Sequence, residues 1–176
     1  MTDNRTVEIK AALDRVADVL GRRPDHGKRT FRSVAVAGRG TTCVVEEAGE
    51  TLTLDVGKAL GGTHAGPSPS MVLRAALGGC IVIGIKQWAA WRGVPIDGVQ
   101  VHVETDVDAR GQLGLEDRAR PGFEAVRLSI LAASPADPII VEDLIVTTLK
   151  YSPLMDVFIG NQPIEYSIHV AQHAQI

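Results

Sequence analysis

Cys80 is the residue in this sequence with the strongest nucleophilic and redox chemistry, because a thiolate attacks electrophiles and can be oxidised reversibly. It lies in the apolar stretch MVLRAALGGCIVIGIK, about ten residues after Pro69, where we predict that a long helix begins. That depth is beyond the reach of the helix N-terminal dipole, and apolar burial disfavours a thiolate. Arg74 and Lys86 are each six residues from Cys80, so they lie on other faces of the helix. The residues alone favour an inert core cysteine, unless a cation reaches the thiol from elsewhere.

The other candidate residues give weaker signals. Cys43 lies in a predicted strand, where a small half-buried hydrophobic residue is the favoured interpretation. His64 lies in the loop before the helix of Cys80, and a surface position is favoured over a role in a site. His102 and His169 fall on the polar faces of predicted strands. The sequence has no CxxC and no metal-like His/Cys spacing, so we expect neither a metal site nor a cofactor.

The composition is that of an ordinary globular protein. The 176 residues are 45% hydrophobic and 22% charged, which fits one domain with a sizeable core. The net charge is -3 and no block is rich in Lys and Arg, so we expect neither nucleic acid nor a membrane as a partner. The start MTDNRTVEIK lacks a signal-peptide pattern, and the apolar run from Ala75 to Ile85 is too short to span a bilayer. Together with two cysteines at unrelated positions, this predicts a soluble cytoplasmic protein.

Hydrophobic spacing in the first third of the sequence predicts one helix followed by a small sheet. Apolar residues recur at helical spacing from about Val7 to Leu20, and Pro24 marks the end of the segment. The pattern then alternates with a period of two, which predicts three antiparallel strands. These strands lie within Phe31–Val36, Thr42–Glu46 and Leu52–Val56.

A long helix is the central element of the prediction. The loop GKALGGTHAGPSPS is rich in Gly and Pro and prepares a sharp entry into a helix at Pro69, with Ser68 or Ser70 as its N-cap. The following stretch, MVLRAALGGCIVIGIKQWAAWRG, is apolar on nearly every side. A helix of this kind is buried between layers or between subunits.

The second half of the sequence contains further strands and a second helix. Alternation predicts three strands, each with one wet face, at residues 99–107, 126–130 and 164–170. Between the last two, Asp137 and Pro138 open a helix that breaks at Tyr151-Ser152-Pro153, before a short helical turn through Phe158. This grouping indicates an α+β fold in which long helices cover one face of each sheet.

Three segments resemble the OsmC/Ohr family of osmotically inducible and organic hydroperoxide resistance proteins. They are VAGRGTT, KALGGTHAGPSPSMVLRAALGGC and LKYSPLMDV, and the resemblance covers roughly Phe31 to Val170. It implies an intertwined homodimer in which antiparallel sheets wrap two long central helices, with active sites at the dimer interface. We therefore expect an N-terminal helical extension over residues 1–24 and an OsmC-like domain over residues 25–176.

The resemblance also implies a cation for Cys80, which corresponds to the helix cysteine of the family. In the peroxidase members an arginine in a GGR-type turn of the first hairpin reaches the thiol, and Arg39 in Ala-Gly-Arg-Gly stands at that place. Such a charge favours the thiolate, which attacks the O–O bond of a hydroperoxide and becomes a sulfenic acid. Cys80 and Arg39 are therefore the expected catalytic residues.

The sequence departs from the family pattern at two positions near the expected site. The peroxidases have a glutamate directly after the proline that opens the helix, where this sequence has Ser70, and a hydroxyl cannot form a bidentate pair with Arg39. They also have a second, resolving cysteine in a Cys-Pro turn, where this sequence has Ser152. The two-cysteine cycle of the family is thus absent, and Cys43 is not expected to replace the second thiol.

Two functions are consistent with these residues. The first is a one-cysteine thiol peroxidase for small hydrophobic hydroperoxides, acting in oxidative stress defence, with an external thiol as the reductant. The second is a non-catalytic dimeric protein that binds a small hydrophobic ligand. A different thiol reaction in the same pocket is a third, weaker possibility. The joint presence of Cys80 and Arg39 favours the redox function.

Overall fold

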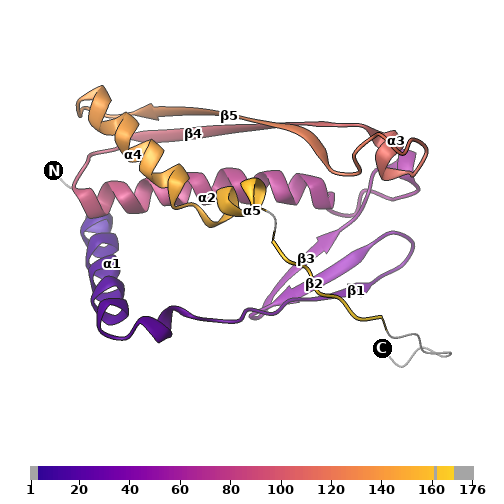
Figure 1. Ribbon diagram of the computed structural model, residues 1–176, viewed down its shortest axis with the longest axis horizontal. Coiled ribbons are helices and arrows are strands. Elements are labelled where there is room, and N and C mark those ends of the chain that lie inside the picture. The colour runs from indigo at the N-terminus through magenta and orange to yellow at the C-terminus, as the bar shows by residue number, and fades with distance from the viewer. Residues whose placement is uncertain (1–3, 161, 169–176) are drawn as a thin grey trace.

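The computed structural model describes residues 4–160 and 162–168 of the chain, and their fold is α+β (Figure 1). The helices are α1 (Asn4–Arg22), α2 (Pro69–Arg92), α3 (Ala109–Gln112), α4 (Pro138–Lys150) and α5 (Pro153–Ile159), with short 3-10 turns at Pro24–Gly27 and Lys58–Leu60. The strands are β1 (Val34–Ala37), β2 (Cys43–Glu47), β3 (Glu50–Leu54), β4 (Gly98–Val107) and β5 (Phe123–Ala133). Every helix and strand predicted before residue 160 is present, with its ends moved by a few residues.

The first three strands form an antiparallel sheet in the order β1-β2-β3. Val36 lies opposite Val44 in one pair, and Val45 lies opposite Leu52 in the other. Within the described residues this sheet is not covered by a helix, and Figure 1 shows it apart from the layer that contains α2, β4 and β5. Within the described residues of one chain, the expected cover of this sheet by a long helix is therefore not seen, and its cover in a dimer stays a prediction.

The other sheet is a long antiparallel pair formed by β4 and β5, and α2 and α4 belong to the same layered unit (Figure 1). Along β4, half-buried Val99, Val101 and Val103 alternate with exposed residues such as His102. Alternation of this kind turns one face of the strand toward α2 and leaves the other in water. The predicted surface position of His102 is therefore confirmed.

Helix α2 begins and ends as its sequence requires. The Ser68 hydroxyl accepts the Met71 amide at 3.3 Å and Pro69 takes the first helical position, so Ser68 is the N-cap. At the other end Gly93, with a φ of 70°, adopts the left-handed conformation that closes a helix. By length and composition α2 could also cross a membrane, a test that the core helix of a soluble protein passes as well.

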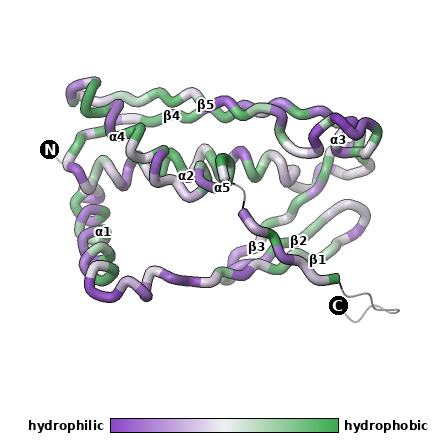
Figure 2. Tube along the Cα trace, in the orientation of Figure 1, coloured by the Kyte–Doolittle hydropathy of each residue, from purple (hydrophilic) through white to green (hydrophobic). Residues whose placement is uncertain are grey.

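Only one side of α2 is buried in the single chain. The core consists of five residues of α2 and two of α4, with half-buried side chains of β4, β5 and α5 around them, and Figure 2 shows hydrophobic residues recurring along α2 and β4. The core residues are Leu77, Ile81, Ile85, Ala89, Ala90, Val141 and Leu144. On the other side Ile83 is 59% exposed. One chain thus covers α2 from one side only, and burial of the other side between subunits stays a prediction.

The end of the described chain differs from the prediction. Residues 162–168 form no strand, although Ile164, Tyr166 and Ile168 alternate with polar residues as predicted. These three side chains are between 77% and 84% exposed, because no strand formed by the described residues lies beside them. The remainder of the predicted strand, residues 169–170, and His169 with it, lies outside the described residues.

Candidate functional site

Cys80 lies in the middle of α2 on the side that faces the start of α5. Its Sγ lies 3.4 Å from the hydroxyl oxygen of Ser152, which is a hydrogen-bond distance for sulfur. The thiol is half-buried and free, and Cys43 is likewise a free, half-buried thiol, in β2. The structure therefore brings together two of the four residues that the sequence selected, across a separation of 72 positions in the chain.

Ser152 is held in place by the junction between α4 and α5. It is the N-cap of α5, its hydroxyl accepts the Met155 amide at 3.3 Å, and Pro153 follows at the first helical position. Only 5% of its surface is exposed. The break in the sequence at Tyr151-Ser152-Pro153 thus turns the chain so that this hydroxyl points at the thiol.

Arg39 lies in the tight turn between β1 and β2. The Gly38 amide donates to the Thr42 carbonyl at 2.8 Å, the Thr42 hydroxyl donates to the Arg39 carbonyl at 2.7 Å, and Gly40 has a φ of 66°. The turn is fixed, but the Arg39 side chain is exposed. Within the described residues its guanidinium forms no hydrogen bond or ion pair, so the single chain does not join it to Cys80.

Ser70 lies in the first turn of α2 and is exposed. Its hydroxyl lies 3.2 Å from that of Ser68, the helix cap, and it makes no hydrogen bond to Cys80 or Arg39 within the described chain. Ser70 thus lies beside the cap of α2, and its side-chain hydrogen bond within the described residues is to that cap.

Asp55 is a buried carboxylate that the sequence analysis missed. It is 2% exposed, and it accepts five hydrogen bonds. The donors are the Thr41 hydroxyl at 2.6 Å, the Val56 amide at 2.8 Å, the Thr63 hydroxyl at 2.8 Å, the Thr63 amide at 2.9 Å and the Ala65 amide at 3.0 Å. The position of an aspartate directly after strand β3 and before a glycine-rich loop was the available signal.

These bonds hold the pKa of the Asp55 carboxyl well below its usual range, chiefly through the Ala65 amide and then the Thr41 hydroxyl. The two bonded amides flank His64, which has a φ of 63° and an exposed side chain. A left-handed conformation at a non-glycine residue persists where surrounding contacts impose it. Asp55 therefore fixes the loop that leads into α2 and ties it, through Thr41, to the turn of Arg39.

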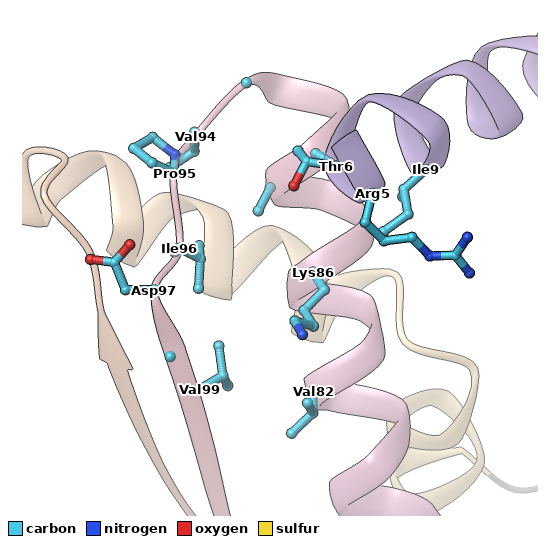
Figure 3. A pocket seen from close by; sticks show the side chains of 14 residues that line it. Arg5, Thr6, Ile9, Val82, Lys86, Val94, Pro95, Ile96, Asp97 and Val99 are labelled. Atoms are coloured by element: carbon cyan, nitrogen blue, oxygen red, sulfur yellow. The ribbon is translucent and has the colours of Figure 1, made fainter. Parts of the chain in front are cut away.

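A cavity of about 730 Å³ lies at the far end of α2, where α1 meets the segment that leads into β4 (Figure 3). Its walls combine apolar side chains such as Val82, Ile96 and Val99 with polar ones such as Thr6 and Asp97, and the Lys86 amine projects into the same region. Neither Cys80 nor Arg39 lines this cavity. Its volume is typical of small-molecule sites, yet it is separate from the thiol.

A second cavity, of about 470 Å³, lies between α2, β5 and α5. Leu73, Val126, Val157 and the stacked rings of Phe123 and Phe158 surround it, and Arg120 and Glu124 are its charged residues. Leu73 precedes Cys80 by seven residues, which places the two on one side of α2, about 10 Å apart along the axis.

Comparisons with known proteins agree on the fold. The family of OsmC-like proteins matches residues 61–167. An OsmC-like protein from Mycoplasma pneumoniae superimposes with a TM-score of 0.65 at 17% identity, covering 76% of this chain and 89% of that one. An organic hydroperoxide resistance protein from Legionella pneumophila gives 0.58 at 20% identity over 76% and 91% of the two chains. Another, from Elizabethkingia anophelis, gives 0.54 at 18% identity over the same shares. No curated protein matches the sequence.

A family match over residues 61–167, which is more than half of the sequence, defines the class of protein. The chain belongs to the family of OsmC-like proteins.

Proposed function

We propose that this protein is a thiol-dependent peroxidase that reduces organic hydroperoxides through Cys80 alone. The observation that carries the proposal is the contact of 3.4 Å between the Cys80 sulfur and the buried Ser152 hydroxyl, in a fold shared with organic hydroperoxide resistance proteins. A polar neighbour at that distance distinguishes this thiol from a cysteine that only fills an apolar core.

The working form is a homodimer of two intertwined chains, with the site at their interface. Three features support this proposal because each lacks a partner within the described residues of one chain. They are the uncovered side of α2, the uncovered first sheet and the exposed apolar residues of segment 162–168. A soluble chain gains stability when such surfaces are buried together. Arg39 has a fixed turn, and its guanidinium is unpaired within the described residues of one chain; in the dimer it reaches a Cys80 thiol.

The chemistry proceeds in three balanced steps. The Cys80 thiolate attacks the terminal oxygen of a hydroperoxide, the O–O bond breaks, and the OH group stays on the sulfur as a sulfenic acid, while the departing alkoxide takes a proton from solvent and leaves as the alcohol. An external low-molecular-weight thiol then forms a mixed disulfide with Cys80 and releases water. A second external thiol restores the Cys80 thiol and leaves as a small disulfide. Ser152 has no sulfur, so the reductant must come from outside the chain.

The substrates are organic hydroperoxides with an apolar body. The cavity of about 470 Å³ supports this choice, since it is lined by aromatic and aliphatic side chains and lies on the Cys80 side of α2. The two free cysteines are consistent with a cytoplasmic protein in a reducing compartment.

The decisive experiment traps the sulfenic acid. Reduced protein is mixed with tert-butyl or cumene hydroperoxide and a sulfenic-acid probe, and labelling is compared among the parent, C80S, R39A and the control R15A, which removes an exposed arginine of α1. We expect no labelling in C80S, about tenfold slower labelling in R39A and an unchanged rate in R15A. Labelling of the parent no faster than that of a free thiol would refute the peroxidase.

The cavity beside α1 favours a second candidate function, the binding of a small hydrophobic ligand without catalysis. Native mass spectrometry of the purified protein tests it. A retained small molecule that is lost in V82W, a variant that fills the cavity, supports this function, and a ligand-free mass for the parent argues against it.

A further inference from the structure

We propose that Ser152 is a positioning residue that donates its hydroxyl proton to the Cys80 sulfur and thereby favours the reactive thiolate. This inference rests on the proposed function, since it concerns the same thiol, and it gives a role to the residue that stands where the peroxidases have their second cysteine. It requires no partner subunit, because both residues belong to one chain.

The direction of the hydrogen bond follows from the partners of Ser152. Its oxygen accepts the Met155 amide at 3.3 Å, and an amide N–H can only donate. The hydroxyl proton is therefore left to point elsewhere, and within the described residues the other polar atom in reach is the Cys80 sulfur at 3.4 Å. If the thiol donated instead, the hydroxyl proton of a residue only 5% exposed would lack an acceptor, which is costly.

The chemical effect follows from the charge of the acceptor. A hydrogen bond to an anion is stronger than one to the corresponding neutral group, so a hydroxyl aimed at sulfur favours the thiolate over the thiol. The Met155 amide polarises the hydroxyl further, because the same oxygen accepts one bond while its proton is donated in another. Neutral Ser152 thus supports the charge at Cys80 from the α5 side, while Arg39 is proposed to support it from the dimer interface.

The rigidity of the junction makes this contact a fixed one. Ser152 is buried between the end of α4 and the start of α5, its amide is bonded to the Leu149 carbonyl at 3.4 Å, and Pro153 restricts the backbone after it. A hydroxyl held in this way does not need to reorganise when the sulfur becomes charged.

The test measures alkylation of Cys80 by iodoacetamide between pH 5 and pH 10, in a C43A background so that one thiol reacts. The reaction forms a carbon–sulfur bond and releases iodide, and it needs no hydroperoxide, so it stays informative if the peroxidase proposal fails. We expect S152A to react about five- to tenfold more slowly at pH 7, with its rate profile moved to higher pH and its limiting rate at high pH preserved.

Three further variants separate hydrogen bonding from folding. S152T keeps the hydroxyl and should restore the parent profile, and S129A, which removes an exposed serine of β5, should leave it unchanged. S152D keeps a helix cap but has no proton to donate, so it should react at least as slowly as S152A at pH 7. Two outcomes would show that the assigned role of Ser152 is wrong. In the first, S152A or S152D reacts like the parent at every pH. In the second, S152A slows the reaction equally at all pH values.

Discussion

The contact between Cys80 and Ser152 depends on two separate local features of the sequence. Cys80 is placed by the long helix that begins at Pro69, and Ser152 by the break before Pro153. Both signals are local, so the sequence predicted both elements. The contact between them depends on how α2, α4 and α5 pack, which no local pattern contains, and resemblance to a family was what linked the two positions.

Replacing Ser152 by cysteine should restore a disulfide partner for Cys80. In the S152C, C43A variant, one equivalent of cumene hydroperoxide should oxidise Cys80 to a sulfenic acid, which the new thiol then attacks with loss of water. The 3.4 Å between the present sulfur and oxygen places the two side chains within reach. We expect an intrachain disulfide, seen as the loss of two free thiols in intact mass with alkylation.

The matched control for that disulfide is S129C, C43A, in which the added thiol lies on the exposed side of β5. It should keep its added thiol free under the same treatment. An S152C protein that retains two free thiols after the treatment would contradict this prediction.

Asp55 shows what sequence reasoning misses at this scale. Its neighbours on the chain suggested the end of a strand, whereas its role depends on donors at Thr41, Thr63 and Ala65 that only the folded loop assembles. A side chain that satisfies backbone amides has no periodic signature, and so it was not predicted.

D55N should lower the melting temperature at neutral pH and make the melting temperature less dependent on pH at acidic pH. The pKa of Asp55 is lowered in the folded state, so its stabilising effect is complete well above the unfolded value, near 3.8, and is lost as the pH falls. Between pH 5 and pH 3 the parent should therefore lose thermal stability more steeply than D55N. Melting curves by circular dichroism at several pH values measure this, and parallel slopes for the two proteins would contradict it.

At the scale of elements, helix spacing and breakers predicted where α1, α2, α4 and α5 lie, and alternation predicted β1 to β5. The short helix α3 was not predicted, because its four residues lie in a polar loop without periodicity. The missing strand at residues 164–168 has a different cause, since its alternation is real but a strand also needs a neighbour.

The contact between α2 and α4 depends on a glycine. A Cβ on Gly84 would lie 2.8 Å from Cγ2 of Thr148, which is 2% exposed and donates its hydroxyl to the Leu144 carbonyl at 2.9 Å. G84A should therefore destabilise the protein by about 1–3 kcal/mol through overpacking, before the gain of up to about 1 kcal/mol from helix propensity is subtracted. Urea unfolding measures the difference.

The control for that substitution is G21A in α1, where an added Cβ meets nothing within 4 Å. It should leave stability unchanged or raise it slightly. If G84A and G21A behave alike, the helices are not as close at Gly84 as the structure describes.

The N-terminal helical extension over residues 1–24 remains a prediction, although α1 is anchored to α2 by the bond of 2.9 Å between the Trp91 indole and Asp14.

At the scale of the whole molecule, the surfaces without partners predict the dimer. Ile83, 59% exposed on the uncovered side of α2, should be buried there, so I83D would place a charge in an apolar interface. We expect the dissociation constant to rise at least about a hundredfold, which corresponds to about 2.7 kcal/mol. Sedimentation velocity over a range of concentrations measures it.

I139D is the matched control, because Ile139 is 76% exposed in the first turn of α4. It should sediment like the parent. A parent protein that is monomeric, or an I83D protein that remains as dimeric as the parent, would contradict the proposed assembly.

The carboxylate of Asp55 also couples the local unfolding of two segments of the chain. It joins the hairpin turn next to Arg39 to the loop that leads into the helix of Cys80, through Thr41 on one side and Thr63 and Ala65 on the other. Neither segment can separate from the body without breaking bonds to the same group. The amides of both segments should therefore exchange with solvent deuterium as one cooperative unit. A local fluctuation that exposes the turn of Arg39 should then also expose the loop that leads into the helix of Cys80.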